Sequence, residues 1–134
     1  MIYLLDTDIS SYLIKENNLS VSKKFDLHRN QEDLIYISSI TLAELLYGVY
    51  KRDRQDINKK ITAFLPLIHI KNFNKRASLE YAKIRVYLES IGRPIGFHDM
   101  QIAACAKAEG AIIVTNNEKH FADVPGVKVE NWVD

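Results

Sequence analysis

The chain has 134 residues, of which 47% are hydrophobic and 26% are charged, and its formal net charge is +1. This length suits one domain with its own hydrophobic core, so we expect a single domain over residues 1–134. The nearly neutral charge excludes a chain that binds nucleic acid over its whole surface, and any such binding requires a local basic patch. The N-terminal residues lack the basic flank and long apolar stretch of a secretory signal or membrane span, which predicts a cytoplasmic protein with no membrane association.

The first half of the chain alternates short apolar runs with amphipathic segments. Residues 2–5 are an apolar run that predicts a strand, and the next residues carry apolar side chains at helical spacing. A polar, basic helix is expected over residues 20–30, and a buried strand over residues 34–37. Amphipathic helices are then expected over residues 41–50 and 55–64.

The second half continues this alternation. The expected elements are, in order, a strand near 68–70, a helix over 73–91, a helix over 99–109, a strand over 111–114, a short helix, and a strand over 127–129. Strands that alternate with helices and read as continuous apolar runs predict an α/β fold with a short, mostly parallel sheet and helices on both faces. Ligands bind such sheets beyond the carboxyl ends of the strands.

Asp6 lies where the first predicted strand ends and the first helix begins. A carboxylate there either caps the helix or forms one corner of a reaction site. Thr7 and Asp8 can both supply the cap, and Asp8 is the better capping candidate. This interpretation leaves Asp6 available for a site, with Thr7 in a supporting position.

Glu44 has two interpretations that the sequence leaves open. The spacing Thr41-x-x-Glu44 is that of a capping box, which favours a solvated capping role. Glu44 also lies on the helix face opposite Leu42 and Leu46, and Gly48 follows it one turn later on the same face. A glycine there leaves room for a ligand to approach, as the wall of a cleft would.

Asp99 is the acid that a structural role explains least well. It lies in line with Ile102 and Ala106, on the helix stripe that should face the core. A carboxylate on such a stripe must be paired, capping, or bound to a cation. His98 can take the capping role, which makes Asp99 a candidate site residue.

Polar residues also follow the strand predicted over 111–114. Thr115 to Glu118 again has the spacing of a capping box, and Asn117 can hold a metal-bound water or a phosphate. We assign Thr115 and Asn117 supporting roles. We expect His120 to be an ordinary surface residue.

The three acids Asp6, Glu44 and Asp99 are expected at one edge of the sheet. Three carboxylates gathered there would repel one another unless a cation lay between them. Hard oxygen ligands suit Mg²⁺ or Mn²⁺, and such an ion lowers the pKa of a bound water and neutralises charge on a phosphoryl oxygen. The pattern therefore predicts a metal site that hydrolyses a phosphodiester.

Four stretches in this order resemble the bacterial PIN-domain ribonucleases of the VapC toxin type: "YLLDTDIS", "SSITLAELLYGV", "GFHDMQIAACAKAEGAIIVTNN" and "VPGVKVENW". The resemblance implies an Mg²⁺- or Mn²⁺-dependent endoribonuclease that cuts RNA, often a transfer RNA. It implies that Asp6, Glu44 and Asp99 are the catalytic metal ligands. It also implies a cognate VapB-type antitoxin whose tail fills the cleft.

The chain departs from the family pattern at two positions. Asn117 stands where many members have a fourth acid, which places a second metal ion in doubt, and Asp8 replaces a frequent Asn. Members of the family usually dimerise through helices, and Leu79 and Val86 form an apolar pair off the main stripe of the long helix. We therefore expect a homodimer.

Several basic residues could contact RNA. Arg93 and His98 are the candidates because they lie near the predicted acids. The basic residues between positions 51 and 76 are expected to be solvated faces, apart from any at the rim of the cleft.

Two other classes of protein remain as alternatives. The stretch "LLDTDIS" resembles the Asp-x-Asp signature of haloacid dehalogenase-type phosphatases, with Asp6 as nucleophile and Asp8 as acid or base. That chemistry needs a downstream catalytic Lys, and no convincing Lys motif is present. The second alternative is a non-catalytic α/β domain that binds a partner or small ligand and uses its acids as helix caps.

Overall fold

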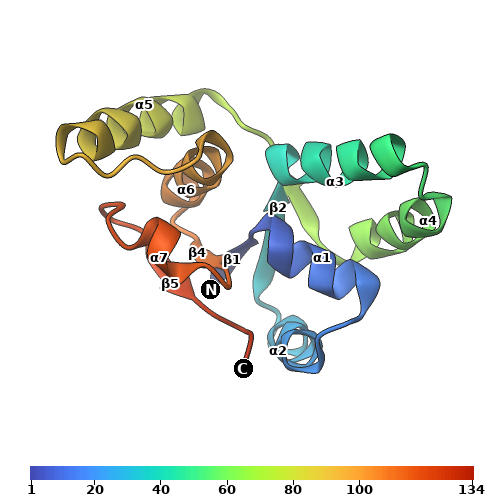
Figure 1. The fold of residues 1–134 in the computed structure, drawn as a ribbon. Coiled ribbons are helices and arrows are strands. Elements are labelled where there is room, and N and C mark those ends of the chain that lie inside the picture. The colour runs from blue at the N-terminus through green and yellow to red at the C-terminus, as the bar shows by residue number, and fades with distance from the viewer.

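The computed structural model describes residues 1–134, which form one five-stranded sheet with helices on both sides (Figure 1). The strands are β1 (Ile2–Leu5), β2 (Leu34–Ser38), β3 (His69–Lys71), β4 (Ile112–Val114) and β5 (Lys128–Glu130). Their order across the sheet is β3-β2-β1-β4-β5, and every neighbouring pair is parallel. The predicted α/β class and parallel sheet are confirmed.

The helices are α1 (Thr7–Lys15), α2 (Leu19–Asn30), α3 (Ser39–Arg52), α4 (Gln55–Phe64), α5 (Lys75–Ser90), α6 (Phe97–Glu109) and α7 (Glu118–Phe121), with a 3₁₀ turn, η1 (Leu65–Leu67), after α4. Most predicted bounds shift by one or two residues. The helix predicted from residue 73, for example, begins at Lys75 because Asn74 caps it and accepts a hydrogen bond from the amide of Ala77. None of these helices combines the length and the apolar character that crossing a bilayer requires.

The sheet separates two hydrophobic cores, because successive side chains on a strand point to opposite faces. Along β1, Tyr3 and Leu5 belong to the core formed with α1–α4, while Leu4 belongs to the core formed with α5–α7. Figure 1 shows these two groups of helices on opposite sides of the strands. Burial on both faces explains why β1 reads as a continuous apolar run.

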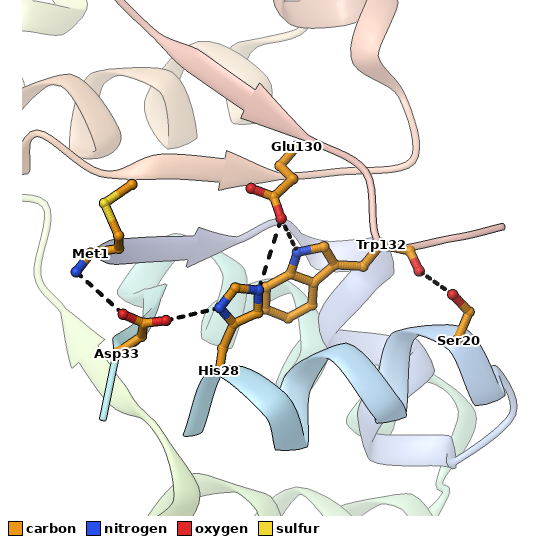
Figure 2. A network of polar contacts seen from close by, with 6 residues as sticks. All are labelled: Met1, Ser20, His28, Asp33, Glu130 and Trp132. Atoms are coloured by element: carbon orange, nitrogen blue, oxygen red, sulfur yellow. Dashed lines mark hydrogen bonds and ion pairs between the residues drawn. The ribbon is translucent and has the colours of Figure 1, made fainter. Parts of the chain in front are cut away.

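The C-terminal tail is fixed against α2 by a fully buried tryptophan (Figure 2). The indole Nε1 of Trp132 donates a hydrogen bond of 2.9 Å to Glu130, and its ring stacks on His28 at 5.0 Å between centroids. His28 Nδ1 lies 2.9 Å from Asp33, and the hydroxyl of Ser20 donates to the carbonyl of Trp132. Trp132 therefore belongs to the core formed with α1–α4.

Candidate active site

A polar cavity of about 240 Å³ lies at the carboxyl edge of the sheet. Its lining contains no hydrophobic residue and consists of Asp6, Thr7, Asp8, Glu44, His98, Asp99, Asn117 and His120. The residue after β1, the second turn of α3 and the first turn of α6 supply the three predicted acids. The parallel topology thus brings together side chains that are far apart in the sequence, at the edge where ligands of such sheets bind.

Asp6 is the N-cap of α1, so the prediction that Asp8 supplies this cap is wrong. Its backbone is extended, and its Oδ1 accepts a hydrogen bond of 2.9 Å from the amide of Ile9. The reason is that β1 ends at Leu5 and α1 begins at Thr7, which leaves Asp6 as the only connecting residue. Asp8 instead lies in the first turn, where the positive end of the helix dipole stabilises its negative charge.

The environment of Asp6 disfavours its charged form. Asp6 is only 5% exposed, and this burial raises the pKa of its carboxyl to about 6. Hydrogen bonds from Thr115 and from the amide of Ile9 act in the opposite direction, while the charges of Asp8 and Asp99 raise the pKa further. A cation in the cavity would relieve this penalty.

The capping box predicted for α3 is also wrong. The helix begins at Ser39, and the hydroxyl of Ser38 caps it by accepting a hydrogen bond of 3.1 Å from the amide of Thr41. The helix begins two residues before Thr41 because Ser38, the last residue of β2, caps it directly. Glu44 consequently lies in the second turn and has no capping role.

Glu44 lines the cavity, and one of its two carboxylate oxygens accepts no hydrogen bond of good geometry. Its Oε2 accepts a hydrogen bond of 3.3 Å from the hydroxyl of Thr7. Its Oε1 lies 2.7 Å from His98 Nδ1, which satisfies an ion-pair distance but not hydrogen-bond geometry. That oxygen is buried and accepts no hydrogen bond at all. A buried carboxylate oxygen without a donor is expected to attract a proton or a cation.

Asp99 lies in the first turn of α6, but His98 does not cap this helix as predicted. The helix begins at Phe97, and Gly96 occupies the N-cap without a side-chain hydrogen bond. His98 is instead directed to Glu44, across the cavity. The Oδ2 of Asp99 lies 2.9 Å from Nδ1 of His120, whose side chain is otherwise exposed.

His120 is a cavity residue that the sequence prediction placed on the ordinary surface. It lies in the short α7, which follows Asn117, and no local sequence pattern distinguishes it from a surface histidine. Asn117 donates a hydrogen bond of 3.2 Å to Asp8. The capping box predicted from Thr115 is absent, because the hydroxyl of Thr115 accepts from the amide of Asn117 and the helix begins at Glu118.

The cavity offers suitable ligands for a divalent cation, although its carboxylates do not converge on one point. In this arrangement no three acidic, histidine or cysteine side chains are close enough together to hold a metal ion. Each of the three acids makes contact with a different neighbour instead. The chemistry nevertheless fits: the cavity supplies carboxylate oxygens from three acids, which are the ligands that Mg²⁺ and Mn²⁺ prefer.

The two residues predicted to contact RNA lie in different places. His98 lines the polar cavity. Arg93 lies outside it, with an exposed guanidinium that is 3.6 Å from Asp123. The phosphatase alternative finds no support in the lining, because no lysine is part of the cavity.

A groove of about 340 Å³ adjoins the polar cavity and runs between α1, α3 and α4. Thr7, Asp8 and Glu44 line both. Gly48 lies on the groove wall, and a Cβ added to it would meet no atom within 4 Å, which agrees with the predicted cleft wall. The groove floor is apolar and its rim is basic: Ile14, Leu45, Val49, Ile57 and Ile61 form the floor, and Lys15, Arg52 and Arg54 the rim.

Comparison with known proteins identifies the family. The model of the PIN domain matches residues 3–127. The chain is 41% identical to Ribonuclease VapC2 of Rickettsia felis over 133 residues, which is 98% of each chain. It is 37% identical to the tRNA(fMet)-specific endonuclease VapC of Shigella flexneri over 131 residues, which is 97% of each.

Solved structures agree with this assignment. The fold matches VapBC2 of Rickettsia felis bound to a promoter DNA fragment, with a TM-score of 0.92, 39% identity, and coverage of 98% of this chain and 99% of the other. It also matches DNA-bound VapBC of Salmonella typhimurium, with a TM-score of 0.90, 30% identity and 98% of each chain covered. The chain therefore belongs to the PIN domain family and, within it, to the VapC group.

Proposed function

We propose that this chain is a metal-dependent endoribonuclease that acts as the toxin of a toxin–antitoxin pair. The observation that carries the proposal is the polar cavity, which gathers Asp6, Glu44 and Asp99 from three separate elements. The relatives' names, Ribonuclease VapC2 and tRNA(fMet)-specific endonuclease VapC, support RNA, including transfer RNA, as the substrate. We propose Mg²⁺ or Mn²⁺ as the cofactor.

Asp6, Glu44 and Asp99 would hold the cation. Once bound, it would supply a water of lowered pKa and would neutralise negative charge on the scissile phosphate. The remaining polar residues orient these acids: Thr7 donates to Glu44, and His120 contacts Asp99. Ligand carboxylates with such partners keep a defined orientation, which favours binding of the metal.

The groove beside the cavity suits a segment of a VapB-type antitoxin. Its apolar floor and basic rim match an amphipathic segment with acidic residues. The similar solved structures are described as VapBC, which supports an antitoxin as partner. Because the groove shares Thr7, Asp8 and Glu44 with the cavity, a bound segment would also cover the acids.

A homodimer is the proposed assembly of the chain. Leu79 and Val86 are 56% and 68% exposed on α5, and their positions on the helix turn them away from Ile84 and Leu88, which are buried. An exposed apolar pair on the outer side of a helix suits a symmetric contact with a second copy.

Cleavage of labelled RNA by the purified chain tests the proposed function. Wild-type protein should cut RNA in Mg²⁺ or Mn²⁺ and stop in EDTA, and Asp6→Asn should be inactive. Asp8→Asn should retain most activity, whereas a phosphatase with Asp8 as acid or base would lose it. Asp53→Asn, at the exposed C-terminus of α3, is a matched control for the loss of one carboxylate.

Two results would overturn this function. Cleavage that survives EDTA would exclude the metal chemistry. Equal cleavage by wild type and Asp6→Asn would show that the cavity is not responsible, and complete inactivity of wild type towards all RNA in both metals would favour the non-catalytic alternative.

A further inference from the structure

Two large aromatic side chains are exposed on helices that line the polar cavity, and each has a cation over its ring. Tyr47 is 64% exposed on α3, and Lys51 Nζ lies 5.6 Å from the centre of its ring. Phe97 is 59% exposed at the start of α6, and Arg85 Cζ lies 5.0 Å from the centre of its ring. Neither ring belongs to a hydrophobic core, so packing within the chain does not explain these positions.

Each ring lies close in sequence to a residue of the polar cavity. Tyr47 follows Glu44 by three residues, and side chains at this spacing are neighbours on a helix surface. Phe97 begins α6 and is adjacent to His98, which lines the cavity. The two rings therefore lie on the two helices, α3 and α6, that supply Glu44 and Asp99 to the cavity.

The pairs are separate from the surfaces proposed for protein partners. Neither Tyr47 nor Phe97 lines the groove between α1, α3 and α4. Phe97 contacts α5 at Arg85, which is about 100° around the helix from Val86 in the proposed dimer contact.

We propose that these two pairs bind the nucleotides on either side of the scissile phosphate. In this proposal, which rests on the proposed ribonuclease function, the rings of Tyr47 and Phe97 each stack against one base. Lys51 and Arg85 pair with the adjoining phosphates. Each pair offers an aromatic ring for a base and a cation for the neighbouring phosphate, which are the two groups that repeat along a nucleic-acid strand.

The proposal restricts the substrate to RNA that is unpaired at the cut. A base inside a duplex is covered on both faces by its neighbours, so it cannot stack on a protein ring. Stacking also tolerates different bases, since every base has a flat face. Tyr47 and Phe97 would therefore select single-stranded loops or ends and contribute little to the choice of sequence.

Binding of a fluorescein-labelled 12-nucleotide RNA tests this inference. Anisotropy is measured in EDTA, so that RNA is not cut, with the strand alone and annealed to its complement. Tyr47→Ala and Phe97→Ala should each weaken binding of the single strand by between about 5-fold and 150-fold, and binding of the duplex should not change. Tyr47→Phe and Phe97→Tyr should retain wild-type affinity, because they keep the ring.

Two further variants separate stacking from charge. Tyr50→Ala is the matched control, because Tyr50 is 73% exposed on the same helix but is not paired with a cation. It should bind RNA as wild type does. Lys51→Ala should reduce the slope of log affinity against log salt by about 0.7, as expected when one phosphate contact to a single strand is lost.

Several outcomes would overturn the inference. Wild-type affinity of Tyr47→Ala and Phe97→Ala for the single strand would exclude stacking. Equal weakening of single-strand and duplex binding would exclude selection of unpaired RNA. Dissociation of a dimer by Phe97→Ala, with unchanged RNA affinity, would assign that ring to the subunit contact. Since binding is measured without cleavage, a failure of the ribonuclease proposal would appear separately, as inactivity of wild type in Mn²⁺.

Discussion

Replacing Asp6 with Asn should stabilise the metal-free protein while it removes the proposed metal site. Burial raises the pKa of Asp6 from its ordinary 3.8 to about 6 in the folded state. The folded carboxyl therefore binds a proton more tightly than the unfolded one, and the free energy of unfolding falls as the pH rises from about 4 to about 6. Above that range the loss of unfolding free energy is constant. A pKa difference of about two units between the folded and unfolded carboxyl corresponds to about 3 kcal/mol.

Asn removes the buried charge and can still cap α1, because its carbonyl oxygen can accept the hydrogen bond from the amide of Ile9. The expected gain is thus up to about 3 kcal/mol near pH 8, decreasing through the range near pH 5 and disappearing near pH 4. Urea denaturation in EDTA at these pH values measures it, with Asp26→Asn, at an exposed carboxylate within α2, as the control. A variant that is no more stable than wild type near pH 8, or a gain that persists unchanged near pH 4, would refute this reasoning.

Three other substitutions test separate parts of the molecule. Trp132→Ala should destabilise the protein by about 3–5 kcal/mol in urea denaturation, because it empties a fully buried site and frees the tail, and an unchanged midpoint would contradict that role. His120→Ala should weaken Mn²⁺ binding by about 10- to 100-fold in calorimetric titration with little change in melting temperature, while unchanged affinity would show that it does not orient Asp99. Val86→Asp should yield monomers in light scattering, and a dimer that persists would place the subunit contact elsewhere.

The strands and their parallel direction were predictable because their signals are local. In β1 and β4, every residue from Tyr3 to Leu5 and from Ile112 to Val114 is buried, and the apolar runs are visible in the sequence. Parallel strands then place their carboxyl ends at one edge, which is enough to predict that Asp6 and the acids of α3 and α6 share a cavity.

The contacts within the cavity were not predictable in the same way. The cap of α1 depends on which single residue separates strand from helix, and the sequence around Asp6 offers three candidates. The partners of Glu44 and Asp99 are histidines that lie 54 and 21 residues further along the chain. Such pairings follow from how α3, α6 and α7 pack, and no local pattern records them.

The central claim is that three acids from separate segments share one divalent cation. Electron paramagnetic resonance of Mn²⁺ titrated into the protein near pH 8 tests it most directly, using wild type, Asp6→Asn, Glu44→Gln and Asp99→Asn. We expect one tightly bound Mn²⁺ in wild type and loss of that binding in each of the three variants. Binding that remains undiminished in any one of them would contradict the claim.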